Sequence, residues 1–187
     1  WTQVHQFKGI HHVNVDTENT DLILSADNSI EEDVYYLQSI QTWPMDNLQA
    51  VRIQFRIDEP TASETEAILS PQIVNFENPE LFIACDIESG SETGAIECYA
   101  QDESQKVMLS NLMNFTLGES HDLAMVFIPS RYGMRFFLDD QFYGELEIPN
   151  VEYWRERNFT LQLESSLKNL ISGGYAVRIE NVTLSQQ

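Results

Sequence analysis

One stretch, residues 121–148, constrains the fold of this chain most, because it reads as three consecutive antiparallel strands. Residues 122–128 are apolar on both alternating faces, which is typical of a central strand covered on both sides. A turn at 129–133 contains Pro and Gly. Apolar residues then alternate with other residues over 134–138 and again over 141–148. The stretch therefore predicts an antiparallel meander within an all-β chain.

The turn between the last two strands of this meander decides their register. A two-residue turn at 139–140 would put the two apolar sets on different faces of the sheet. A loop one residue longer sets Leu138 opposite Phe142. It also sets Phe136 opposite Gly144, so that the apolar faces of the two strands coincide. The sequence therefore predicts a three-residue loop, with one loop residue in the left-handed conformation.

The rest of the chain shows the same short-period pattern. Residues 49–58 alternate most cleanly between apolar and polar side chains. The last strand, 175–185, changes parity along its length, which predicts a bulge near Glu180-Asn181. Many short strands separated by turn signals, without an amphipathic helix or an interdomain linker, predict a single antiparallel β-sandwich domain over residues 1–187.

Two segments resemble a known family. The segment RFFLDDQFYGELEI, with its Asp-initiated turn, is similar to the "fYlDGklvGev" hairpin of concanavalin A-like (laminin G-like) jelly-roll domains. The segment GYAVRIENVTL is similar to the strand that closes many bacterial members. The chain has Asp140 where the family usually has Gly, and Asp tolerates the left-handed conformation that this position needs. The resemblance implies a jelly-roll sandwich, a fold that serves lectins, glycosidases and adhesive domains alike.

The charge of the chain restricts its partners. It has 30 acidic and 10 basic side chains, a formal net charge of −20. This balance argues against nucleic acid and anionic membrane surfaces, and favours cations, neutral sugars or basic proteins. No apolar run approaches the roughly 18–20 residues of a membrane-spanning helix, so we expect no membrane insertion within this segment. The chain starts at Trp1 without Met, which we interpret as a processed form or an excised domain.

The two cysteines flank a turn-forming segment, residues 89–94. A hairpin folded symmetrically about this segment places Cys85 directly opposite Cys98 on an apolar face. Cross-strand neighbours at that distance can form a disulfide. The alternative is two buried free thiols. We predict the disulfide, and with it an extracytoplasmic location, either secreted, periplasmic or at the cell surface.

The same hairpin predicts a polar cluster on its other face. Asp86 falls opposite Glu97, and Tyr99 shares their face. Like charges directly across a sheet repel each other. Three arrangements relieve this repulsion: both carboxylates point into water, they pair with Arg52 and Arg56, or they bind a cation such as Ca²⁺.

Two tryptophans, Trp43 and Trp154, fall in predicted loops. Sugar recognition stacks the apolar faces of the sugar rings on aromatic side chains, while carboxylates and amides bind the hydroxyls. Exposed loop tryptophans on an acidic sandwich therefore predict a sugar-binding surface. The alternative is that each ring packs in the core or at an edge of the sandwich.

Motifs of the common enzyme classes are absent from the sequence. It contains no G-x-S-x-G, H-E-x-x-H, P-loop or GxGxxG motif. It also lacks the E-x-D-x-x-E triplet typical of retaining glycosidases of this fold, and Glu145 and Glu147 are the nearest match. We therefore predict an exported non-catalytic recognition module that binds carbohydrate, with no cofactor other than Ca²⁺. The alternatives are an adhesive domain that binds another protein, and a glycoside hydrolase without the usual triplet.

Overall fold

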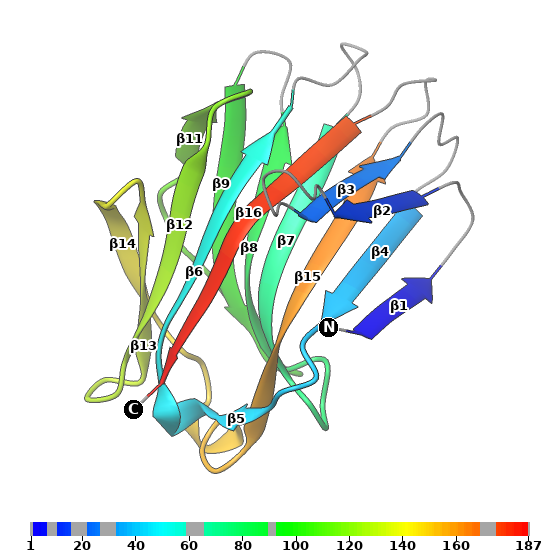
Figure 1. Ribbon diagram of the computed structural model, residues 1–187. Coiled ribbons are helices and arrows are strands. Elements are labelled where there is room, and N and C mark those ends of the chain that lie inside the picture. Colours follow the sequence, from blue (N-terminus) through cyan, green and yellow to red (C-terminus); the bar gives the residue numbers. More distant parts are fainter. Residues whose placement is uncertain are drawn as a thin grey trace.

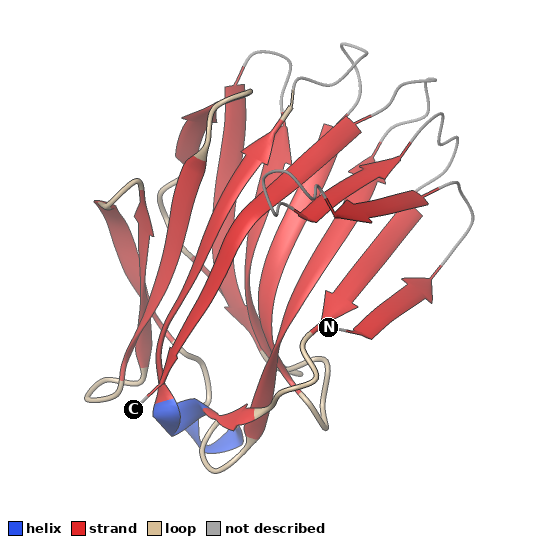
Figure 2. Cartoon of the chain, viewed as in Figure 1, coloured by secondary structure: helices blue, strands red, loops and turns tan. Residues whose placement is uncertain are grey.

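Alternating apolar side chains give most strands one inward and one outward face, and two antiparallel sheets pack their inward faces together (Figures 1 and 2). The computed structural model describes residues 2–6, 11–15, 22–26, 33–58, 66–89, 93–168 and 175–186. The predicted all-β antiparallel sandwich is confirmed. Within the described part of the chain, no helix is long and apolar enough to cross a membrane.

Sheet A lies behind sheet B in Figure 1. Its main path runs in the order β1 (Thr2–Gln6), β4 (Asp33–Gln38), β15 (Asn158–Lys168), β7 (Glu66–Asn75), β8 (Phe82–Ser89), β9 (Thr93–Gln101) and β10 (Lys106–Met108). Two short strands attach to it, β11 (Met113–Thr116) on β9 and β5 (Trp43–Pro44) on β15.

Sheet B runs in the order β14 (Gln141–Glu147), β13 (Gly133–Leu138), β12 (His121–Ile128), β6 (Leu48–Ile57), β16 (Tyr175–Gln186), β3 (Leu22–Ala26) and β2 (His11–Val15). Two 3-10 turns, η1 (Met45–Asn47) and η2 (Val151–Tyr153), lie in connections at one end of the sandwich.

The core forms where the two inward faces meet. Strand β6 has the clean alternation expected of it, and its inward side chains Val51, Ile53, Phe55 and Ile57 are fully buried. In β12 the inward residues are buried as well, but on the outward face Val126 and Ile128 are only half-buried. The prediction that this strand is covered on both sides is therefore wrong at those two positions.

The β13–β14 turn corrects the predicted register. Leu138 pairs with Gln141, so the turn has two residues, and the predicted three-residue loop is wrong. Asp139 and Asp140 both have positive φ, 52° and 61°, as a two-residue turn of this kind requires. A register shift between Phe136 and Phe137 then absorbs the one-residue offset, so that the predicted pairing of Phe136 with Gly144 is confirmed. The apolar faces of the two strands consequently coincide after all.

The side chain of Asp139 explains why an acidic residue opens this turn. One carboxylate oxygen accepts the backbone N–H of Asp122 at 2.9 Å, and the other lies 2.7 Å from Nδ1 of His121.

The bulge turns Phe142 outward, where it is 54% exposed beside Phe137. A second bulge lies between Ile179 and Asn181 in β16, where the parity change of the last strand predicts it.

Candidate functional site

The β8–β9 hairpin has the predicted register. Cys85 lies opposite Cys98, Asp86 opposite Glu97, and Ala84 opposite Tyr99. The two cysteines form a disulfide and belong to the buried core, so the predicted pairing is confirmed. Because side chains alternate along each strand, Asp86, Glu97 and Tyr99 project from the opposite, outer face of sheet A.

A groove of about 620 Å³ lies on this outer face. Five strands of sheet A (β4, β15, β7, β8 and β9) and the segment after β7 contribute to it. The side chains that line it are Gln38, Gln72, Val74, Asn75, Phe76, Pro79, Phe82, Tyr99, Gln162 and Glu164.

Strand register arranges the polar residues of this face in two rows that cross the sheet. The amide row contains Gln38, Gln162 and Gln72, each opposite the next, and it continues through Ala84 to Tyr99. The second row, which we call the carboxylate row, contains Glu164 opposite Ser70, and Asp86 opposite Glu97. The two rows bring three carboxylates and three amides of distant sequence segments to one surface.

Hydrogen bonds join the two rows into a continuous chain. Nε2 of Gln72 donates to Oε2 of Glu164 at 2.7 Å and to Oγ of Ser70 at 3.2 Å. Oγ of Ser70 in turn donates to Oδ1 of Asp86 at 2.6 Å. Gln162 donates to the Oε1 of Gln72 at 3.3 Å. Glu164 and Asp86 lie two strands apart, which corresponds to roughly 10 Å between their backbones.

Tyr99 ends the amide row beside Asp86. Burial raises the pKa of its phenol, and the negative charge of Asp86 and a hydrogen bond to it raise that pKa further. Nζ of Lys106 lies 3.5 Å from the centre of the ring, and Phe82 packs edge-on against it at 5.7 Å. The phenol therefore stays protonated at neutral pH and can donate a hydrogen bond to Asp86.

The two arginines of the predicted cluster lie elsewhere. Arg52 and Arg56 project from β6 in sheet B, on the other side of the sandwich. Arg52 pairs with Asp122 at 2.9 Å, and Arg56 pairs with Asp58 at 3.1 Å. The alternative in which these arginines neutralise the hairpin carboxylates is wrong, because polar alternation fixes the face of a strand but not the sheet to which it belongs.

The two predicted sugar-stacking tryptophans are buried. Trp43 is 2% exposed and Trp154 is 0% exposed. Trp154 stacks on Phe159 at 5.4 Å and donates from Nε1 to the Pro149 carbonyl at 2.8 Å. Trp43 lies in β5, which pairs with the same end of β15. The alternative in which each ring packs in the core is therefore confirmed, and the predicted sugar-stacking role of these two residues is wrong.

The cation prediction stays open. Within the described ranges, no group of three or more His, Cys, Asp or Glu side chains is arranged to hold a metal ion. One oxygen of Asp86 already accepts the Ser70 hydroxyl. Ca²⁺ at Asp86 and Glu97 therefore stays a prediction.

Sequence reasoning missed Ser70, Gln72, Gln162 and Glu164. Ser70 and Gln72 occupy alternate positions of the segment SPQIVN, and Gln162 and Glu164 occupy alternate positions of LQLES. The residue between the two members of each pair is apolar. This alternation marks the outward face of both strands. Their adjacency arises because β15, from the end of the chain, inserts between β4 and β7.

No protein-family model and no curated protein matches the sequence. Solved structures do match in three dimensions. Alginate lyase A1-II′, a member of polysaccharide lyase family 7, has a TM-score of 0.64 and 8% identity, with 94% of this chain and 83% of that chain covered. An alginate lyase from Pseudomonas aeruginosa has a TM-score of 0.62 and 10% identity, with 97% and 88% covered.

A glycoside hydrolase family 16 endo-glucanase from Bacteroides ovatus is similar as well, with a TM-score of 0.63 and 9% identity over 98% of this chain and 94% of that chain. The chain therefore has the concanavalin A-like jelly-roll fold that its sequence resembles. All three proteins are enzymes that act on polysaccharides. This finding overturns the prediction of a non-catalytic recognition module, and the alternative of a glycoside hydrolase agrees with it better.

Proposed function

We propose that this chain is a polysaccharide-processing enzyme whose substrate binds in the groove on sheet A. The observation that carries the proposal is the hydrogen-bonded chain from Glu164 through Gln72 and Ser70 to Asp86. Paired carboxylates on one open surface are what glycoside cleavage requires, and amides beside them suit sugar hydroxyls. The enzymes of similar fold act on alginate and glucan.

The charge of the groove favours a neutral glycan and hydrolysis. None of the described residues that line it is Arg, Lys or His. Asp86 and Glu97 place negative charge on the same face. A polyuronate chain would bring like charge to this surface. A neutral polysaccharide carries no such penalty.

In the proposed mechanism, Glu164 gives its proton to the glycosidic oxygen as the bond to the anomeric carbon breaks. Asp86 takes a proton from the water whose oxygen forms the new bond to that carbon. The spacing of two strands leaves room for this water, as inverting glycosidases require. Hydrogen bonds from Ser70 and Tyr99 hold the Asp86 carboxylate in place.

We also propose an extracytoplasmic location. The disulfide between Cys85 and Cys98 supports it, because such bonds persist in oxidising compartments. A polysaccharide substrate is consistent with that location.

The test is an activity assay on a panel of neutral glucans, mannans, xylans and galactans, with alginate included. New reducing ends and the ultraviolet absorbance of unsaturated sugars are both measured. We expect reducing ends without unsaturation from one neutral glycan. Glu164→Gln and Asp86→Asn should each lower the rate by about 10²–10⁴-fold, whereas Asp122→Asn, on sheet B, should not.

Three results would contradict the proposal: no cleavage of any glycan, cleavage that survives both substitutions, or equal loss in Asp122→Asn. Unsaturated products from alginate would show that the enzyme cleaves its substrate by elimination and not by hydrolysis.

A further inference from the structure

Phe76 combines an exposed aromatic ring with a fixed backbone. Its side chain is 62% exposed, yet its N–H donates to the Asn158 carbonyl at 2.9 Å. The preceding residue, Asn75, is buried, and its side chain accepts the N–H groups of Glu77 and Asn78 at 3.0 and 2.7 Å. Asn75 also donates from Nδ2 to the same Asn158 carbonyl. The ring is therefore presented from a rigid turn, so ordering it on binding costs little.

The ring lies at the apolar end of the groove. Val74 pairs with Phe82 two positions beyond Gln72, near the end of β7. Phe76 and Pro79 follow that end, so these four lining residues lie together, away from the amide row. Phe76 lies six positions after Ser70, just beyond the end of β7. At the rise of an extended strand, six positions correspond to roughly 20 Å. The apolar end is therefore separated from the carboxylate row by more than one sugar ring.

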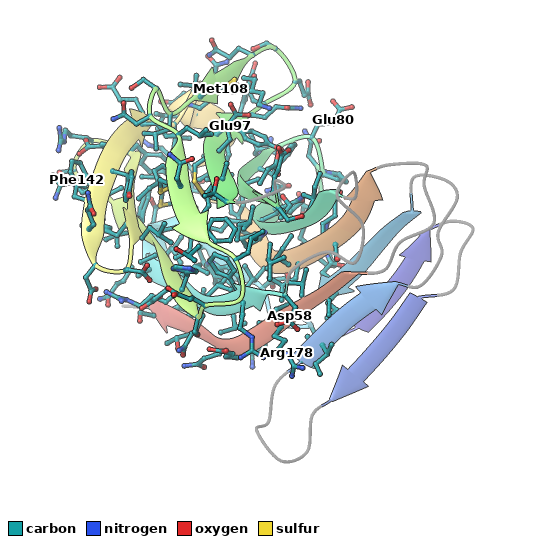
Figure 3. All side chains as sticks on the ribbon, turned by 90° about the horizontal axis from the view of Figure 1, so that it is seen from above. Asp58, Glu80, Glu97, Met108, Phe142 and Arg178 are labelled. Carbon is teal, nitrogen blue, oxygen red and sulfur yellow. A yellow bond between two sulfur atoms is a disulfide. The ribbon has the colours of Figure 1, made fainter. Side chains whose placement is uncertain are left out.

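The surroundings of Phe76 select against charged sugars. Glu77 and Glu80 are exposed in the same turn, and Figure 3 labels Glu80 on this side of the sandwich. Their like charge disfavours an acidic sugar at this turn, whereas a neutral pyranose carries no such penalty and offers a C–H face to the aromatic ring.

We propose that Phe76 is a stacking platform for a neutral pyranose at a distal subsite, which makes this residue a determinant of substrate length. A chain long enough to reach from the carboxylate row to Phe76 gains the stacking contact, and a disaccharide at the carboxylate row does not. This inference rests on the proposed function, because it takes the groove as the substrate site.

The chain offers a matched control. Phe142 is also a half-exposed phenylalanine, but it projects from β14 in sheet B. Phe142→Ala removes a similar amount of exposed aromatic surface outside the groove, because Phe142 is 54% exposed and Phe76 is 62% exposed. Phe76→Trp keeps a stacking surface at the platform itself.

The experiment measures binding of the neutral glycans of the same panel, and of their oligosaccharides from the disaccharide upward, by isothermal titration calorimetry. Phe76→Ala should weaken binding of long chains about tenfold, as the loss of an aromatic contact predicts, and leave the disaccharide unchanged. Phe76→Trp should retain long-chain binding, and Phe142→Ala should match the wild type. In kinetics, Phe76→Ala should raise KM for the polymer without lowering kcat.

The outcomes separate the two proposals. If Phe76→Ala binds every long glycan as the wild type does, or binds long and short chains equally less tightly, the proposed stacking role of Phe76 is wrong. This holds even when hydrolysis depends on Glu164. If no glycan is cleaved but long-chain binding depends on Phe76, the platform stands and the hydrolase proposal fails. Melting curves of all variants verify that each is folded.

Discussion

The outer faces of the two sheets differ in how their charges are satisfied. On sheet B, arginines pair with carboxylates of the same face, and Figure 3 labels one such pair on the opposite side of the sandwich from Glu97. These pairs are Arg52–Asp122, Arg56–Asp58, Arg178–Asp58 and Arg135–Glu145. On sheet A, Asp86 accepts a hydrogen bond from a hydroxyl, and Glu164 accepts one from an amide. The carboxylates of sheet B are tied into ion pairs, whereas those of sheet A take part in a hydrogen-bond network that includes neutral donors.

The support beneath the two faces differs as well. The strands that carry Asp86 and Glu97 are joined on their inner side by the Cys85–Cys98 disulfide. In sheet B the strands under the arginines are held by ordinary packing, with Phe55 and its neighbours fully buried. The covalent link thus lies directly under the polar cluster of sheet A, where like charges face each other across the hairpin.

The disulfide carries the largest expected effect on stability. Replacing both Cys85 and Cys98 by Ala should lower the free energy of unfolding by about 3 kcal/mol, because the bond closes a loop with a sequence separation of 13. Denaturant titration measures this loss. Reductant should destabilise the wild type by a similar amount and leave the double variant unchanged. Equal stability of the two proteins would contradict the importance of this link.

Two glutamines provide a matched pair across the faces. Gln72 is buried in the amide row and bonds to Glu164 and Ser70, whereas Gln54 is exposed on sheet B and bonds to Ser120. Gln72→Leu should cost about 1–3 kcal/mol, since it removes the donor from buried Ser70 and from half-buried Glu164. Gln54→Leu should stay within about 0.5 kcal/mol. Thermal melting of both variants measures the difference, and equal shifts would remove the distinction between the faces.

These regions also differ in how far the sequence predicts them. The disulfide and the order of Asp86, Glu97 and Tyr99 follow from one local hairpin, in which a turn fixes every cross-strand partner. The alternation of β6 likewise predicts its buried face. Local pattern is sufficient wherever the partner strands are neighbours in the sequence.

The rest depends on contacts between distant segments. Glu164 reaches the site only because β15 inserts between β4 and β7, and no local pattern contains that order. Arg52 has the predicted outward orientation but belongs to the other sheet. Trp154 lies in an irregular connection, as expected, yet tertiary packing on Phe159 buries it. Sheet membership and loop burial are therefore the two properties that the sequence pattern leaves open.

Tyr99 gives a pH test of the sheet A cluster. Its pKa is raised by burial and by Asp86, so folding favours the protonated phenol. This contribution is complete below the unfolded pKa of about 10 and is lost as the pH rises toward the folded pKa. The wild type should therefore lose up to about 1.4 kcal/mol per pH unit relative to Tyr99→Phe above pH 10.

Denaturant titrations across this pH range measure the difference. Tyr132, whose pKa burial also raises, serves as the comparison outside the cluster. Asp86→Asn should reduce the alkaline sensitivity that depends on Tyr99 and leave that of Tyr132 unchanged. If the Asp86→Asn variant had the same alkaline profile as the wild type, Asp86 would not raise the pKa of Tyr99.

The smallest expected effect concerns a single ion pair of sheet B. Arg52 and Asp122 are 2.9 Å apart, but their side chains are 47% and 38% exposed. A double-mutant cycle with Arg52→Ala and Asp122→Ala should give a coupling below about 1 kcal/mol that salt reduces further. The corresponding cycle for Ser70 and Asp86 should give about 1.5–3 kcal/mol, because Ser70 is buried and bonds to a charged group. Stronger coupling between Arg52 and Asp122 than between Ser70 and Asp86 would contradict this comparison. The polar rows of sheet A would then not be a preorganised site.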